Sequence, residues 1–269
     1  MRCLSSYQDG ENVVYEEKAG ERDLEAMPRL ADEHVPGKPD VMLSLIMKAH
    51  IAIKEATKEA QTPMVFWSTA PQKTSIVNIF RSSGINFTGF TYEPPPQVLQ
   101  MRLLKLAIPD LKCIGHSYNP TYPPAILTRQ ELETADRLLK VPKTLDAFET
   151  SIAVMRDEGC SGFIVGPHEL FNGNAKTIAE FAIKYRLAAL SVQSSFPKAG
   201  GLAAYPLLSN GVWPAMALVV DRILKGEKPS DIPTERCFKS PLLLNLNAVR
   251  ELGIELSATL IDKAEELIS

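Results

Sequence analysis

Short apolar runs alternate with amphipathic segments along most of the 269-residue sequence, and this alternation constrains the fold more than any other feature. The runs have the length of buried strands, and the segments between them repeat apolar residues every three or four positions, as helices do. Alternating strands and helices are typical of α/β folds with parallel sheets. The predicted strands are 39–46, 62–71, 112–120, 160–167 and 187–192, and the predicted helices are 48–60, 75–81, 97–107, 145–157 and 175–185.

The sequence is long enough for two lobes. Its 45% hydrophobic content can fill two cores of moderate size, and the run Pro94–Pro96 marks a break between two groups of strands. We predict two Rossmann-like lobes with largely parallel sheets. Lobe one comprises 1–91 and 201–232, and lobe two comprises 92–200 and 233–269. Three crossings between the lobes predict a hinge, because short connecting segments can absorb a dihedral change while packed lobes move as bodies.

The stretch 199–233 is expected to return the chain from lobe two to lobe one. A Gly pair opens it and permits close approach of backbones, and Leu202–Leu207 follows as a short apolar strand that we assign to lobe one. A helix comes next and ends near Gly226. The apolar segment 241–246 then returns the chain to lobe two, and 257–268 is expected to form a closing helix.

Charge and motif content exclude several classes of function. The formal net charge is −3 and no run of Lys and Arg occurs, so we expect no nucleic-acid partner. No apolar run reaches the roughly 18 residues of a membrane span, and the first residues lack the apolar core of a signal peptide. The motifs of phosphate-binding loops, serine hydrolases, zinc hydrolases and dinucleotide sites are absent. We therefore predict no enzyme, no catalytic residues, no metal and no cofactor.

The four cysteines, Cys3, Cys113, Cys160 and Cys237, are far apart and form no C-x-x-C pair. This spacing indicates neither a zinc site nor a disulfide framework, and we interpret them as isolated thiols packed as small apolar residues. A racemase-like enzyme, in which two thiols exchange a proton with the substrate, is a less favoured alternative. Cys113 and Cys160 both fall in lobe two, whereas such an enzyme needs thiols that face each other.

A long, ordered set of residues near the C-terminus carries a family resemblance. These residues are Gly200, Gly201, Leu202 and Tyr205, then Asp221 to Gly226 with Lys228 and Pro229, then Asp231, Ile232 and Pro233, and finally Asn245 and Leu246. The pattern closely resembles the substrate-binding proteins of ABC importers, of the tryptophan and aromatic-amino-acid type. The resemblance implies the two-lobed periplasmic binding protein type I fold, a small-molecule ligand held between the lobes, and a transient partner, the ABC permease in the membrane. It also implies a periplasmic or other extracytoplasmic location.

The resemblance begins late in the family's pattern. The segment 7–17 resembles the family's Gly-Tyr-x-x-Gly-x-Asn-Val segment, and Asn12–Glu16 reads as a short strand. Family members have a central strand and a helix before this point, so about 40 residues of lobe one are expected to be missing, judged by the size of a doubly wound lobe. Loss of a central strand would leave neighbouring strand edges unpaired.

The candidate ligand-binding residues follow from the position of sites in parallel sheets, which lie beyond the carboxyl ends of strands. This rule selects polar and loop residues that follow the predicted strands, with one residue at the first crossing. From lobe one they are Ser44, Ile46, Met47, Ser68, Thr69 and Tyr205; from lobe two they are Tyr118, Asn119, His168 and Gln193; and Tyr92 lies at the crossing. The serines and threonine are equally consistent with helix caps or turns, and the tyrosines with interface packing.

The loops depart from the family in ways that bear on the ligand. Relatives commonly have Gly-Thr-Pro where this chain has 45–47, Ser-Asp-Pro where it has 69–71, and Pro-Asp where it has Pro167 and His168. Two carboxylates that could face an ammonium group are therefore replaced, although Glu169 could supply one. Because burying an unpaired ammonium is costly, we predict a ligand less amine-like than tryptophan, such as an aromatic or branched carboxylate. His168 is also consistent with a capping role.

Another function remains compatible with the same fold. A bilobal protein can act as a ligand-sensing regulator with a signalling or DNA-binding partner in place of the permease. The sequence contains no helix-turn-helix pattern or coiled-coil extension, which disfavours that alternative.

Overall fold

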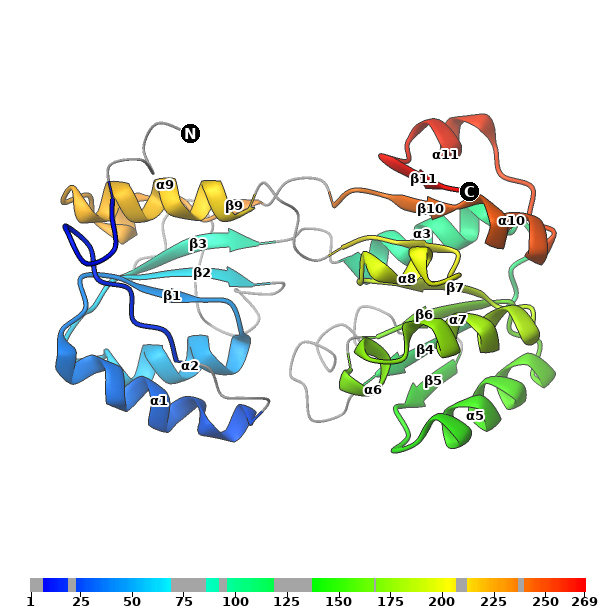
Figure 1. Cartoon of the computed structure of the whole chain (residues 1–269), viewed down its shortest axis with the longest axis horizontal. Helices are drawn as coiled ribbons and strands as arrows, with labels where there is room; N and C mark the ends of the chain where they lie inside the picture. The colour runs from blue at the N-terminus through cyan, green and yellow to red at the C-terminus, as the bar shows by residue number, and fades with distance from the viewer. Residues whose placement is uncertain are drawn as a thin grey trace. The chain divides into compact units, whose positions relative to one another are not determined.

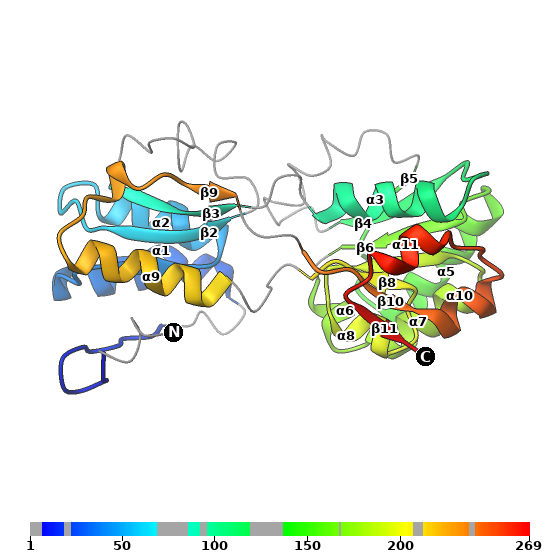
Figure 2. The same ribbon diagram turned by 90° about the horizontal axis from the view of Figure 1, so that it is seen from above.

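The computed structural model describes residues 7–18, 23–68, 86–91, 96–118, 137–166, 168–206, 212–236 and 240–269. The chain forms two compact units (Figures 1 and 2). Unit 1 comprises Met1–Glu93 and Asn210–Phe238, and unit 2 comprises Pro94–Ser209 and Lys239–Ser269. Within the described ranges, no helix combines the length and the apolar character that a membrane crossing requires.

Unit 1 is built on a parallel sheet. Its four strands are β1 (Met42–Ser44), β2 (Met64–Ser68), β3 (Phe87–Thr91) and β9 (Glu235–Arg236), in the order β1-β2-β3-β9. Every pairing between them is parallel. Among the described residues β1 lies at one end of the sheet, and Leu43 in this strand is 54% exposed.

Helices cover both faces of this sheet. Helices α1 (Met27–His34) and α2 (Met47–Ala56) pack on one face, where Met64 and Phe66 join their apolar residues in one core. Helix α9 (Val212–Leu224) lies on the other face and contacts β2 and β3 (Figure 1). The short helices η2 (Leu24–Ala26) and η3 (Val35–Gly37) flank α1, and η4 (Pro229–Asp231) follows α9.

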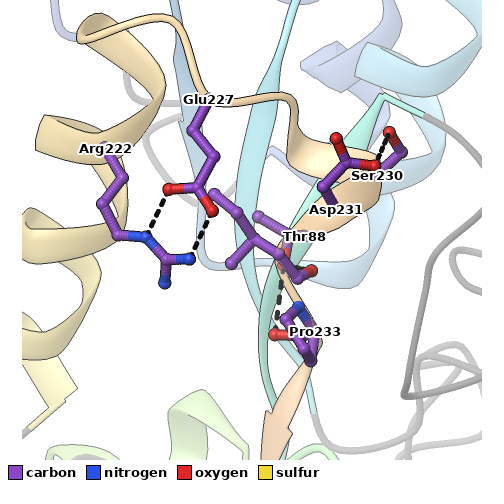
Figure 3. Close-up of polar contacts among 7 residues, drawn as sticks. Thr88, Arg222, Glu227, Ser230, Asp231 and Pro233 are labelled. Atoms are coloured by element: carbon purple, nitrogen blue, oxygen red, sulfur yellow. Dashed lines mark hydrogen bonds and ion pairs between the residues drawn. The ribbon is translucent and has the colours of Figure 1, made fainter.

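The segment after α9 is held by polar contacts (Figure 3). Glu227 accepts two hydrogen bonds from Arg222, at 2.6 Å and 2.5 Å, directly after the helix ends. The hydroxyl of Thr88 in β3 donates to the carbonyl of Ile232 at 2.8 Å. These contacts fix the path of the chain from α9 to β9, which pairs with β3 at the edge of the sheet. The charged and turn-forming residues after the helix provide the contacts.

Unit 2 is built on a larger sheet with the order β11-β10-β8-β7-β6-β4-β5. All its pairings are parallel except that between β8 and β10, so the prediction of an α/β fold with largely parallel sheets is confirmed. The strands are β4 (Ile114–Tyr118), β5 (Arg137–Lys140), β6 (Gly162–Val165), β7 (Ala188–Ser191), β8 (Ala203–Ala204), β10 (Leu243–Asn245) and β11 (Glu266–Ile268).

Side-chain alternation along the strands divides the core of unit 2 into two layers. Phe163 packs with α5 (Leu145–Asp157) and α7 (Ala175–Lys184), whereas the adjacent Ile164 packs with α3 (Pro96–Ala107). Figure 2 accordingly shows α3 and α7 on opposite sides of the sheet. The remaining helices of the unit are α6 (Glu169–Asn172), α8 (Ser195–Lys198), α10 (Leu246–Leu252) and α11 (Ala258–Asp262).

The predicted strand Leu202–Leu207 was assigned to the wrong sheet. Its described part, β8, pairs in parallel with β7 and antiparallel with β10, so it belongs to unit 2 and not to lobe one. Gly201 is required here because a Cβ atom would lie 2.1 Å from the ring of Phe196. The side chain of Asn245 then ties β10 to this corner, since it donates to the carbonyl of Pro197 at 2.7 Å and accepts from the first amides of α10.

Two local predictions also need correction. The expected closing helix 257–268 is instead α11 followed by β11, because Glu266–Ile268 pairs with β10. The expected strand Asn12–Glu16 is a turn with one isolated bridge between Asp9 and Val13. The predicted helix 75–81 lies outside the described residues.

Cys113 and Cys160 form a disulfide, which contradicts their interpretation as isolated thiols. Their Cα atoms are 4.2 Å apart although 47 positions separate them in the sequence. They precede the adjacent strands β4 and β6, so strand pairing brings them together. Both residues are buried in the core that also contains Phe163 and Phe148.

We expect peptides containing Cys113 and Cys160 to resist alkylation in denaturant until a reductant is added, as measured by peptide mapping. Removing the cross-link in C113A/C160A should lower the free energy of unfolding by about 2–4 kcal/mol, because the unfolded chain is then no longer constrained by a loop closed over 47 positions and gains conformational entropy. Complete alkylation of both residues without reductant would contradict the assignment.

Candidate functional site

The carboxyl ends of the strands of unit 1 carry three hydroxyl residues. Ser44 ends β1, Ser68 ends β2 and Thr91 ends β3, and all three are buried. Ser68 and Thr91 are register partners, and Ser44 pairs with Phe66, two residues before Ser68. Because the strands are parallel, these hydroxyl groups lie at one edge of the sheet, as predicted from the position of Ser44 and Ser68.

Ser44 has an unused hydrogen-bonding group at this edge. Its side chain is 3% exposed, and its Oγ has no hydrogen-bond partner among the described residues. Its carbonyl accepts from Nε2 of His50 at 3.0 Å, which ties α2 to the end of β1. Helix α2 starts directly beyond, with Ile46 in an extended conformation and no side-chain cap. The amides of its first turn have no carbonyl partner within the helix, and they follow Ser44 closely in the sequence.

The apolar candidates beside Ser44 differ from each other. Ile46 is 40% exposed, so its side chain is available at the edge. Met47 is buried within unit 1, so in this structure its side chain contributes packing.

In unit 2, Tyr118, Gln193 and Tyr205 lie at one edge of the sheet. Tyr118 ends β4, Gln193 follows β7, and Tyr205 follows β8, which is parallel to β7. The amide of Gln193 donates to Oγ of Ser191 at 3.3 Å, and the amide of Tyr205 donates to the carbonyl of Ser191 at 3.1 Å. Burial raises the pKa of the Tyr205 phenol. Tyr205 therefore belongs to this edge and not to lobe one.

The turn after β6 is fixed by Ser117 and Gly166. The amide of Gly166 donates to Oγ of Ser117 at 2.8 Å. A Cβ atom at position 166 would lie 2.2 Å from the carbonyl oxygen of Ser117, so only glycine fits. Sequence reasoning missed this buried serine, because it lies inside the strand and not after it.

His168 acts as a helix-capping residue in this structure. Its Nδ1 accepts from the amide of Leu170 at 3.1 Å, at the start of α6, and its ring centroid lies 5.8 Å from that of Phe171. The accepting Nδ1 places the proton of the neutral ring on Nε2. The candidates Thr69, Tyr92 and Asn119 lie outside the described residues.

Three buried polar residues that the sequence did not single out lie on the α3 side of unit 2. Gln97 and Gln100 are on α3, and His116 is in the middle of β4. Gln97 Oε1, both amide atoms of Gln100 and both ring nitrogens of His116 have no hydrogen-bond partner in the described part of the chain. The available signal was two glutamines on a helix face that otherwise buries apolar residues, including Met101 and Leu104.

Burial keeps two histidines neutral. It lowers the pKa of His116 to about 4, and it lowers that of His50 to about 4 despite an opposing contribution from the hydrogen bond to Ser44. Neither imidazole therefore supplies a positive charge near neutral pH. Across the described ranges, no group of three or more His, Cys, Asp or Glu side chains is arranged to hold a metal ion.

Two hollows in unit 1 are lined by residues other than the three hydroxyl residues. One, of about 370 Å³, is lined by Pro63 and Asn86, which precede β2 and β3 at the amino end of the sheet. The other, of about 420 Å³, lies between α1 and α2 and is lined by Glu25 and Lys48. Asn86 donates to the carbonyl of Gln61, and Lys48 pairs with Glu25. Since these groups are already paired, we favour the carboxyl edges, where Ser44 has an unused hydroxyl.

Comparison with known proteins identifies the family. The sequence profile of the family described as "ABC transporter substrate binding protein" matches residues 5–268. The chain belongs to this family. No curated protein matches it by sequence. As an ABC substrate-binding protein it is the ligand-binding component of an import system, which confirms the resemblance found in the sequence.

Solved structures agree with this assignment at the level of the fold. A conserved domain protein from Vibrio cholerae has a TM-score of 0.81 at 20% identity, over 98% of this chain and 90% of that chain. An ABC domain from Streptococcus pneumoniae in complex with L-Trp has a TM-score of 0.81 at 18% identity, over 99% and 91%. The ligand-free, open structure of a substrate-binding protein with adhesive properties from Clostridium difficile has a TM-score of 0.71 at 18% identity, over 100% and 92%. The fold is that of periplasmic binding proteins of type I.

The two neutral histidines predict a pH dependence of stability. Their folded pKa values of about 4 lie below the ordinary value of 6.5, so the unfolded chain binds more protons between these values. The free energy of unfolding should therefore fall as the pH drops from about 6.5 to about 4, by on the order of 3 kcal/mol for each histidine. Urea unfolding across this range should show a flatter profile for His50→Gln and His116→Gln. A profile identical to that of the unsubstituted protein would refute the explanation.

Proposed function

We propose that this substrate-binding protein binds an aromatic or branched carboxylate without a free ammonium group, at the carboxyl edges of its sheets. The supporting observation is the chemistry of the described strand ends. They offer hydroxyl, amide and phenol groups, such as those of Ser44, Gln193 and Tyr118, together with the amides of helix amino ends. Neutral donors of this kind suit a carboxylate and a polar or aromatic substituent.

A zwitterionic ligand would need a partner for its ammonium group. Glu169, the first residue of α6, is the acidic residue that comes soonest after a strand end among the described residues at these edges. The position occupied by an acid in relatives holds His168, whose Nδ1 is occupied by the amide of Leu170. An ammonium group buried without a carboxylate costs several kcal/mol, which disfavours an amino acid as the preferred ligand.

Binding without chemical conversion is the activity that these groups support. The enzyme alternative required Cys113 and Cys160 as free thiols, but each sulfur is bonded to the other in the disulfide and cannot exchange a proton with a substrate. His50 uses Nε2 to hold the carbonyl of Ser44, so it is placed to position the backbone of this edge. We therefore propose that the protein has no catalytic role.

The proposed location is extracytoplasmic, with a membrane permease as the partner that receives the ligand. Family membership implies both the small-molecule ligand and the permease. The disulfide between Cys113 and Cys160 supports the location, because disulfides persist in oxidising compartments and are rare in the cytosol.

Isothermal titration with matched ligands tests the proposal. We expect indole-3-propionate to bind at least about 10-fold more tightly than L-tryptophan, and 3-phenylpropanoate more tightly than L-phenylalanine, because each acid lacks the ammonium group that would be left unpaired. A clear preference for the two amino acids would overturn the proposed ligand class.

A serine pair provides the control for the position of the site. Ser44→Ala should weaken binding of the preferred acid several-fold, whereas Ser151→Ala on α5 should not, because the Ser151 hydroxyl donates to the carbonyl of Ala147 within its own helix. Equal affinities for both variants would argue against a contact at the end of β1.

A further inference from the structure

The buried face of α3 contains an unusual pair of amides. Gln97 is 8% exposed and Gln100 is fully buried, on the same face as Met101 and Leu104. Gln97 lacks a partner for Oε1, and Gln100 lacks partners for both Oε1 and Nε2, among the described residues. A buried amide atom without a partner costs about 1–3 kcal/mol, so these side chains lower the stability of the ligand-free protein.

His116 lies on the face of the sheet that α3 covers. Ile114 packs in one core with Leu104 of α3, and residues two apart in a strand share a face. Ile164, the register partner of His116, packs in the same core. His116 is 2% exposed and neither ring nitrogen has a partner in the described ranges.

Gln100 and His116 lie at one level of the sheet, and Gln97 lies closer to its carboxyl edge. Leu104 lies against Gly162, since a Cβ atom there would be 3.0 Å from Leu104 Cδ1. Gln100 is four residues earlier in α3, about 6 Å along the axis, and Ile164 is two residues later in β6, also about 6 Å. Gln100 is therefore level with Ile164 and His116. Gln97 is a further helical turn toward the edge, near the level of Tyr118.

The amino terminus of α3 lies at the same edge. The helix has 12 residues and leads directly into β4, so it runs antiparallel to the strands that it covers. The amides of its first turn have no carbonyl partner within the helix and carry a partial positive charge, which favours an anion. The Gln97 amide can rotate to present either its oxygen or its N–H group to that position.

We propose that the amino terminus of α3 and the Gln97 amide bind the carboxylate of the ligand, with Gln100 and His116 as positioning residues behind Gln97. This inference rests on the proposed function, in which the ligand is a carboxylate. A carboxylate at this position accepts from the first-turn amides and from Gln97. The carboxylate thereby gives an acceptor to the first-turn amides and to the N–H group of Gln97, once the Gln97 amide is rotated to present that group.

The test uses two Gln→Met substitutions, which nearly preserve side-chain volume, and measures ligand affinity and melting temperature. Gln97→Met and Gln100→Met remove the amides and keep the side-chain length, and Gln61→Met, at an exposed amide near the amino end of the unit 1 sheet, is the control for binding. The probes are indole-3-propionate, its primary amide and L-tryptophan. Dissociation constants come from calorimetry, and melting temperatures are measured without ligand.

We expect Gln97→Met to weaken binding of indole-3-propionate by about 10- to 100-fold, and binding of the neutral amide much less, because a hydrogen bond to a charged group is lost only for the acid. Gln100→Met should weaken binding of indole-3-propionate by a smaller factor. The melting temperatures of both variants should stay equal to that of the unsubstituted protein or rise, because a buried amide without a partner is replaced by an apolar group. The control should leave the affinity for all three probes unchanged.

Two outcomes would overturn the inference. The first is an unchanged affinity of Gln97→Met for the acid, because the amide would then not contact the ligand. The second is a melting temperature of either variant lowered by several degrees, because the amides would then stabilise the fold. If the unsubstituted protein prefers L-tryptophan, the proposed ligand class fails, but a loss of L-tryptophan affinity in Gln97→Met still supports the carboxylate site. If no probe binds, a lowered melting temperature refutes the inference and a raised one supports it.

Discussion

Parallel strand pairing is the constraint on which the rest of this structure depends. It places the carboxyl ends of consecutive strands at one edge of each sheet, so residues distant in sequence are brought together. In unit 1 it assembles Ser44, Ser68 and Thr91, and in unit 2 it assembles Tyr118, Gln193 and Tyr205. The position of these polar groups thus follows from strand register, and the buried core of each unit keeps that register fixed.

The sequence predicted the fold class and the family because both depend on local patterns. Apolar runs and helical periodicity identified most described strands, and the ordered residues after Gly200 carried the family resemblance. Membership of a sheet depends instead on distant partners. Ala203 and Ala204 fit either lobe by composition, and only their pairing with β7 and β10 assigns them to unit 2. The disulfide was missed for the same reason, because it depends on β4 and β6 being neighbours.

Candidates for the proposed site could be predicted from the sequence only by the rule that sites lie at the ends of strands. Ser44 satisfies that rule, and the structure adds that its hydroxyl is buried without a partner in the described residues. Gln97, Gln100 and His116 do not satisfy it, because they lie within elements whose pattern marks them as core. Their polarity conflicts with their burial, and such conflicts between local chemistry and environment are where functional residues are expected. His168, in contrast, satisfies the rule but caps a helix.

The most direct test of the account is amide hydrogen exchange, measured with and without a bound ligand. Exchange should slow in peptides that contain the carboxyl ends of strands in both units, namely 44–50 in unit 1 and 116–118 and 191–196 in unit 2, together with the first turn of α3. Peptides at the amino ends of the strands, such as those containing Pro63 or Cys160, should not change. Protection concentrated at the amino ends of the strands would contradict the proposal that the carboxyl edges of the sheets bind the ligand.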